Sequence, residues 1–193
     1  KWGCTALMFA ALKGHTKTVR SLLANGANIN AQSKSGGTAL MIAAQNGHTD
    51  TVKLLLENRA KTDTQNKDRW TALMMATFRG HTETVELLLE NRAKVDLQNK
   101  DGTTALMVAA QKGHTEIVQL LLANGANINA QNKDQWTALI FAAQNGDTDM
   151  VQLLLENGAV DAQNKDGTTA LMVAALNGHS ETMQSLLANG AKT

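Results

Sequence analysis

Residues 101–133 read DGTTALMVAAQKGHTEIVQLLLANGANINAQNK, and variants of this 33-residue stretch fill the chain. The tripeptide Thr-Ala-Leu marks six copies, beginning at Thr5, Thr38, Thr71, Thr104, Thr137 and Thr169. Self-similarity at a fixed period of this length predicts an array of stacked structural repeats. We therefore expect a single array over residues 1–193, with repeats one to six at 2–34, 35–67, 68–100, 101–133, 134–165 and 166–193. Because the chain opens partway through a repeat, we expect it to be a fragment of a longer protein.

Each repeat contains two helical patterns followed by a turn. Residues 104–113 place a leucine, two alanines and a glycine at i, i+3, i+4 and i+7, which predicts a first helix with one closely packed face. Residues 114–125 place valine and leucines on one face and end at a glycine suited to a left-handed helix end. The Asn-rich residues after it lack a helical period and indicate an extended turn. The prediction is an all-α solenoid of helix-turn-helix units joined by extended turns.

The landmarks Gly, Thr-x-Leu, Ala-Ala, Gly-His, Leu-Leu and Gly-Ala occur in this order in residues 101–133. This order resembles the ankyrin repeat, and the resemblance covers the whole chain. The family's Thr-Pro-Leu-His is replaced here by Thr-Ala-Leu-Met, or by Thr-Ala-Leu-Ile at Ile140, and the chain contains no proline. The resemblance implies an ankyrin solenoid that binds proteins through its turn tips and the outward face of its first helices.

All five histidines lie in Gly-His pairs, at His15, His48, His81, His114 and His179. Packed helices lie about 8–10 Å apart, whereas nitrogens that share a zinc ion each lie about 2.0–2.1 Å from it. We therefore expect no metal array. Asp147 stands where repeat five would have its histidine, and Asp is a preferred N-cap residue. Both residue types are thus expected to cap the second helix or to bond to the turn.

Other chemical motifs are missing from the sequence. It has no phosphate-binding glycine loop, no zinc-protease signature and a single cysteine, Cys4. We expect no catalytic residues, no cofactor and no enzyme activity. No apolar run approaches the roughly 18 residues that a membrane helix needs, and the lone cysteine favours a reducing compartment. The expected protein is a cytoplasmic monomer without a membrane partner.

Function is then expected to reside in a surface that binds a protein or peptide partner. In repeat arrays, variable positions on the concave side are free to recognise a partner. The candidate positions at the turn tips and the ends of the first helices, with one inner position, are Asp68, Trp70, Met75, Phe78, Arg79, Thr103, Gln111, Lys112, Asp134, Trp136, Gln144 and Asn145. We expect Trp70, Phe78, Arg79 and Trp136 to contribute most, because Trp and Arg often carry interface energy.

One apolar position recurs in all six first helices, at Phe9, Ile42, Met75, Val108, Phe141 and Val173. Helical geometry places this column opposite the Leu-Ala-Ala face, on the inner side. Two interpretations remain open: packing between repeats, or an apolar floor for a partner.

Charge is unevenly distributed along the chain. Residues 1–100 hold 14 Lys or Arg against 8 Asp or Glu, a balance of +6, and residues 101–193 hold 4 against 9, a balance of −5. Arg59 and Arg92 replace the glycine that ends other second helices, which predicts a left-handed backbone at both. The net charge of +1 and the lack of alternating aromatic and basic residues argue against nucleic acid as the partner. Two other roles stay open: a structural spacer without a dedicated partner, and a substrate-recruiting part of a larger enzyme.

Overall fold

The computed structural model describes residues 3–192, and within this range it contains twelve α-helices and no strand. The predicted boundaries at residues 1, 2 and 193 lie outside the described residues. The chain forms two compact units, an N-terminal half that ends at Lys100 and a C-terminal half that begins at Asp101. Each half contains three helix pairs, and every pair follows the predicted helix-turn-helix pattern. The predicted all-α repeat solenoid is confirmed.

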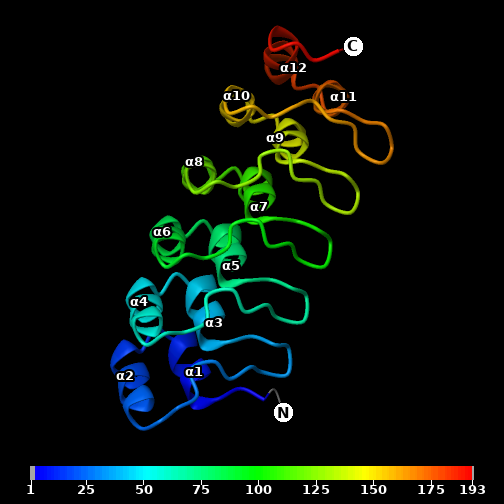
Figure 1. Cartoon of the computed structure of the whole chain (residues 1–193). Helices are drawn as coiled ribbons and strands as arrows, with labels where there is room; N and C mark the ends of the chain where they lie inside the picture. Colours follow the sequence, from blue (N-terminus) through cyan, green and yellow to red (C-terminus); the bar gives the residue numbers. More distant parts are fainter. Residues whose placement is uncertain (1–2, 193) are drawn as a thin grey trace. The chain divides into compact units, whose positions relative to one another are not determined.

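The helices of the N-terminal half are α1 (Ala6–Leu12), α2 (Thr16–Ala24), α3 (Ala39–Gln45), α4 (Thr49–Glu57), α5 (Ala72–Arg79) and α6 (Thr82–Glu90). Those of the C-terminal half are α7 (Ala105–Lys112), α8 (Thr115–Ala123), α9 (Ala138–Asn145), α10 (Thr148–Glu156), α11 (Ala170–Leu176) and α12 (Ser180–Ala188). Within each half the first helices form one layer and the second helices another, and extended hairpins project from the side of the first helices (Figure 1). Hairpin tips and first helices therefore share a face.

The Thr-Ala-Leu tripeptide is a helix start. In all six repeats the threonine is the N-cap of the first helix, and its side-chain oxygen accepts a hydrogen bond from the backbone N–H three residues later. In α5, for example, Thr71 Oγ1 accepts from the N–H of Met74 at 3.2 Å. Because this bond satisfies a donor that the helix itself leaves free, the motif fixes where each first helix begins.

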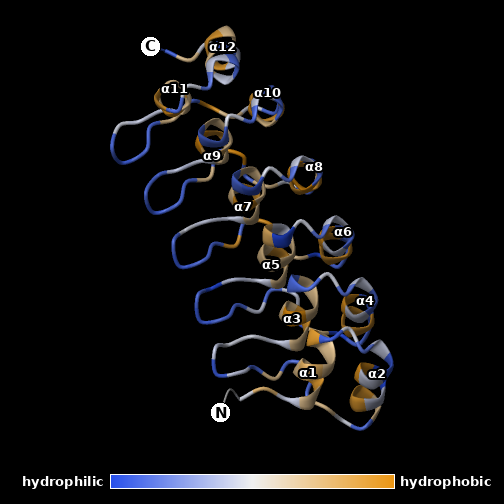
Figure 2. Cartoon of the chain, turned by 180° about the vertical axis from the view of Figure 1, so that it is seen from behind, coloured by the Kyte–Doolittle hydropathy of each residue, from blue (hydrophilic) through white to orange (hydrophobic). Residues whose placement is uncertain are grey.

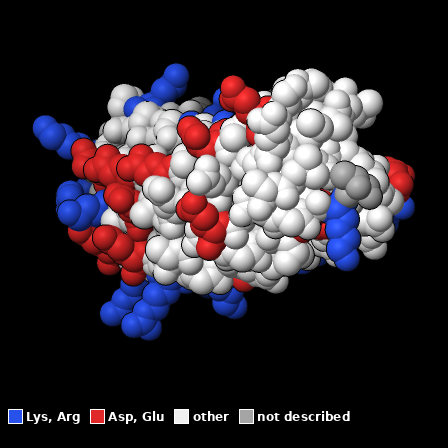
Figure 3. All heavy atoms as spheres, turned by 90° about the horizontal axis from the view of Figure 1, so that it is seen from above, with Lys and Arg blue, Asp and Glu red and all other residues white. Residues whose placement is uncertain are grey.

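The core of each half is formed by the apolar faces of its first and second helices, while the hairpins are hydrophilic (Figure 2). The methionine after Thr-Ala-Leu is 1% exposed in repeats one to four, and Ile140 takes its place in repeat five. In repeat six, Met172 is 47% exposed. The side of this repeat that faces the viewer in Figure 3 is largely uncharged. Burial of this position thus depends on the first helix of the following repeat.

Among residues 3–192, four residues other than glycine have positive φ. Arg59 (φ 64°) and Arg92 (φ 60°) confirm the left-handed backbone predicted after the second helices. Arg69 and Gln135, both at φ 61°, lie at hairpin tips where other repeats have glycine, and their left-handed backbone was not predicted. A left-handed backbone costs such a residue about 1–2 kcal/mol, so both tips retain a side chain at an energetic cost.

Buried threonines connect neighbouring second helices. Thr16 and Thr51 share a hydrogen bond between their hydroxyls at 2.9 Å, and Thr148 and Thr182 share one at 2.8 Å. Thr51 and Thr182 are almost fully buried. These pairs leave no local signal in the sequence, because their partners lie 34 or 35 residues apart in separate repeats.

Thr77 of α5 is fully buried, and its hydroxyl has no hydrogen-bond partner among the described residues. Because an unpaired buried polar group costs about 1–3 kcal/mol, Thr77→Val should raise the free energy of unfolding by about 1 kcal/mol. Thr71→Val is the matched control in the same repeat, since its hydroxyl caps α5, and it should lower stability by about 1 kcal/mol. Urea denaturation followed by circular dichroism measures both. A loss of stability in Thr77→Val would show that the hydroxyl is satisfied in solution.

Candidate functional site

His48, His81 and His179 connect successive repeats. The Nε2 atom of His48 lies 3.1 Å from the carbonyl oxygen of Leu12, at the end of the preceding first helix. His81 contacts the carbonyl oxygen of Gln45 at 3.2 Å in the same way. Neither side chain forms a capping hydrogen bond to its own second helix. Of the two expected roles, capping is therefore wrong for these histidines, because the ring bonds to the carbonyl at the end of the preceding repeat's first helix instead.

Three glycines that directly follow or end a first helix make room for the histidine ring of the next repeat: Gly14, Gly47 and Gly146. A Cβ atom on Gly14 would lie 2.6 Å from Nδ1 of His48, and one on Gly146 would lie 2.5 Å from Nδ1 of His179. Both glycines have positive φ. At these three positions the glycine of one repeat thus packs against the imidazole of the next, as part of the scaffold.

Asp147 shows how the scaffold adapts where the histidine is missing. Its Oδ1 accepts a hydrogen bond from the N–H of Met150 at 3.0 Å, which confirms the predicted N-cap of α10. A carboxylate cannot donate to the preceding carbonyl. The side-chain amide of Asn145 does so instead, at 2.8 Å from the carbonyl oxygen of Gln111. The side chain of Asn145, a predicted site residue, is therefore engaged in contact between repeats.

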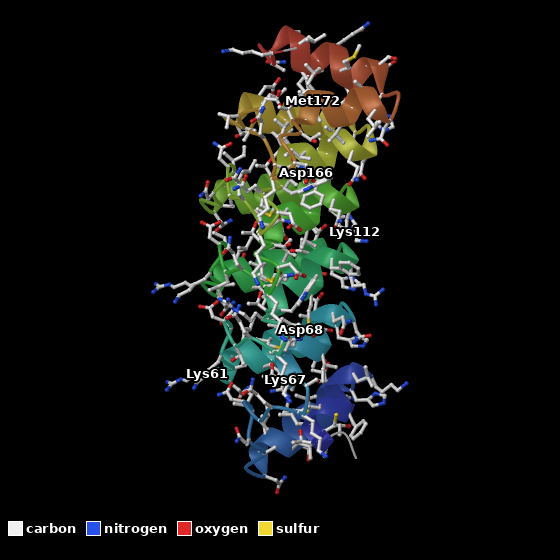
Figure 4. All side chains as sticks on the ribbon, turned by 90° about the vertical axis from the view of Figure 1, so that its right-hand side faces the viewer. Lys61, Lys67, Asp68, Lys112, Asp166 and Met172 are labelled. Atoms are coloured by element: carbon white, nitrogen blue, oxygen red, sulfur yellow. The ribbon has the colours of Figure 1, made fainter. Side chains whose placement is uncertain are left out.

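The hairpin tips of successive repeats are hydrogen-bonded within each half. The N–H of Lys100 donates to the carbonyl of Asp68 at 3.0 Å, and Lys165 donates to Asp134 at 3.1 Å. The same residues form ion pairs at 3.2 and 3.7 Å. Figure 4 views the hairpin side, where Asp68 is labelled. Such exposed pairs contribute about 0–1 kcal/mol, so the backbone bonds mainly hold Asp68 and Asp134 in place.

The N-terminal half brings together four of the predicted site residues. The rings of Trp70 and Phe78 meet edge to face, with centroids 5.8 Å apart. The guanidinium carbon of Arg79 lies 5.7 Å from the centroid of Phe78, a distance typical of a cation–π contact. Met75 belongs to the same helix as Phe78 and Arg79, α5, and is partly exposed.

Three of these residues line a hollow of about 280 Å³, which we call the Trp70 hollow. Its lining residues are Gln45, Asn66, Trp70, Met75 and Phe78. Asn66 was not among the sequence candidates. Its side-chain oxygen accepts hydrogen bonds from the N–H groups of Asp68 at 3.0 Å and Trp70 at 2.8 Å, so it fixes the tip that carries the indole. The Asn-Lys-Asp turn motif was the available signal, since Asn commonly forms such local bonds.

The C-terminal half arranges its tryptophan differently. Trp136 packs on Phe141 of its own repeat, with ring centroids 5.0 Å apart and planes 41° apart. Phe141 occupies the repeat position of Met75, and Gln144 that of Phe78. Trp136 therefore covers the first turns of α9. The other candidates in this half have exposed side chains at Gln111, Lys112 and Gln144 and a partly exposed one at Thr103.

The apolar position that recurs in all six first helices is buried in some repeats and accessible in others. Val108 and Val173 are 2% and 5% exposed, so packing between repeats is correct for them. Phe9 is 58% exposed, and Ile42, Met75 and Phe141 are partly exposed. The column offers accessible apolar surface in four of the six repeats.

Within residues 3–192, no three His, Cys, Asp or Glu side chains are arranged to hold a metal ion. The helices described for this range are also too short or too polar to cross a membrane.

Comparison with known families gives a match along the whole chain. The family model described as "Ankyrin repeats (3 copies)" matches residues 1–66, 40–132 and 120–193. No curated protein matches the chain.

Proposed function

This chain belongs to the ankyrin-repeat family, whose members are generally protein–protein interaction modules, and we propose that it binds a protein or peptide partner through its hairpin tips and first helices. The family is typically non-catalytic, and the proposal includes no reaction. In an ankyrin array this face is the concave one. We further propose that all six repeats act as one array.

The Trp70 hollow is the observation that carries this proposal. Trp70, Met75 and Phe78 present accessible apolar surface around it, and Phe78 is 37% exposed. Interface hot spots are enriched in Trp and Arg and lie in pockets that a partner can desolvate. A tryptophan, a phenylalanine and an arginine grouped at one accessible hollow are therefore suited to anchor a partner.

Affinity capture from a lysate of the source cell tests the proposal. We expect the parent protein to retain a partner that the variant Trp70→Ala/Phe78→Ala/Arg79→Ala loses. The matched control is Lys53→Ala/Glu57→Ala/Glu86→Ala, which changes three exposed residues on second helices of the same half. Circular dichroism establishes that all three proteins are folded.

The outcomes separate the alternatives. Loss of the partner from the second-helix control alone would place binding on the opposite face and contradict the proposal. A failure of all three proteins to retain a specific partner would favour the spacer role.

A further inference from the structure

The Trp70 hollow has the size and lining for one side chain. Its volume of about 280 Å³ lies just below the range of about 300–1,000 Å³ that is typical of small-molecule pockets. Trp70, Met75 and Phe78 supply an apolar lining, and Gln45 and Asn66 complete it with amides. A single leucine, isoleucine or aromatic side chain from a partner is the occupant that this space suits best.

The charges beside the hollow are mainly positive. Arg79 lies against Phe78, and Arg69 directly precedes Trp70 at the hairpin tip. Both side chains are exposed. The adjacent carboxylate, Asp68, forms an ion pair with Lys100 at 3.2 Å. The whole N-terminal half carries 14 Lys or Arg against 8 Asp or Glu, so the potential around the hollow favours an acidic partner.

The backbone at Arg69 provides an independent observation. Arg69 has φ 61°, at a position where repeats two, four and six have glycine. Strained residues of this kind cost of order 1–3 kcal/mol and cluster at functional sites. Gln135 has the same conformation beside Trp136, so the strain accompanies both tryptophan tips. Of these two strained residues, only Arg69 carries a positive charge.

We propose, as an extension that rests on the proposed function, that the Trp70 hollow binds an acidic peptide segment of a partner protein. One apolar side chain of this segment enters the hollow and packs against Trp70, Met75 and Phe78. Arg69 and Arg79 then contact carboxylates that flank this side chain. Guanidinium groups bind carboxylates through paired, charge-assisted hydrogen bonds, and the contact with Phe78 holds Arg79 at the rim of the hollow. The hollow selects the apolar residue, and the two arginines select the acidic context.

The test uses a phage-displayed library of random 12-residue peptides, selected on the immobilised full chain. We expect the enriched peptides to share one large apolar residue flanked by Asp or Glu. Synthetic copies labelled with fluorescein are then titrated by fluorescence anisotropy. Trp70→Ala and Arg69→Glu/Arg79→Glu should each weaken binding at least tenfold, and binding should weaken further as salt is raised.

The matched control is Arg59→Glu/Arg92→Glu. These two arginines lie in the same half, are exposed, and share the positive φ of Arg69. The control changes the net charge by the same amount at a different place, so it should weaken binding much less than the tip variant. Equal losses in the two variants would show that net charge alone attracts the peptide and would overturn the role of Arg69 and Arg79.

Two further outcomes distinguish this inference from the proposed function. Enriched peptides that require Trp70 but are neutral or basic would overturn the acidic partner and leave the binding face intact. Peptides that bind Trp70→Ala as tightly as the parent would overturn both. Circular dichroism of every variant ensures that the losses reflect the surface rather than unfolding.

Discussion

Gly47→Ala should lower the free energy of unfolding by about 2–4 kcal/mol. Gly47 has φ 68°, which costs an alanine about 1–2 kcal/mol. The added Cβ would also lie 2.7 Å from Nδ1 and Cε1 of His81. Because this ring is bonded to the carbonyl of Gln45, it cannot move away without weakening a hydrogen bond worth about 1 kcal/mol. Urea denaturation followed by circular dichroism measures the change.

Two further variants separate the backbone cost of a positive φ from the cost of the contact with the His81 ring. Gly26 has φ 81°, and a Cβ atom added to it would have no neighbouring atom within 4 Å, so Gly26→Ala should show the backbone cost alone. In Gly47→Ala/His81→Ala the clash is removed, and the added cost of the glycine substitution should fall to that of Gly26→Ala. Equal effects of Gly47→Ala and Gly26→Ala in the parent would show that the packing of histidine on glycine contributes nothing to stability.

The repeat architecture follows from local signals in the sequence. Thr71, for example, caps the helix that begins one residue later, so the regular spacing of Thr-Ala-Leu locates every first helix. Contacts between repeats are harder to predict, because they join residues in separate repeats. The bond from His48 to the carbonyl of Leu12 depends on how closely two helix pairs stack. A single repeat therefore could not distinguish a capping histidine from one that bonds to its neighbour.

The candidate site shows the same division. Trp70, Phe78 and Arg79 could be grouped from the sequence, because one hairpin and the helix after it carry all three. The different packing of Trp136 could not be predicted from the sequence. Phe141 replaces Met75 at the repeat position beneath the indole, and its larger ring gives Trp136 a stacking partner. Gln144 replaces Phe78, so the edge-to-face partner is also missing there. The packing of each tryptophan thus depends on side-chain size at two positions.

The methionine after Thr-Ala-Leu gives the second large expected effect. Met107→Ala should lower the free energy of unfolding by about 2–5 kcal/mol, the cost of truncating a buried methionine, because Met107 is 1% exposed in the packed first-helix layer. Met172 is the matched control, since it occupies the same repeat position in the same half but is 47% exposed. Met172→Ala should cost less than about 1 kcal/mol, because it removes little buried surface and leaves no enclosed cavity.

Chemical denaturation of both variants, with thermal melting as a second measurement, gives the loss of unfolding free energy in each. The comparison tests whether a buried methionine stabilises the fold because the next repeat stacks on it. The two substitutions remove identical atoms from equivalent helix positions, so helix propensity and side-chain entropy are nearly equal. The difference between them then measures what the following first helix contributes by covering the methionine. Equal losses would show that Met172 is also covered in solution, and they would contradict the nearest-neighbour packing that makes burial of each repeat depend on the next one.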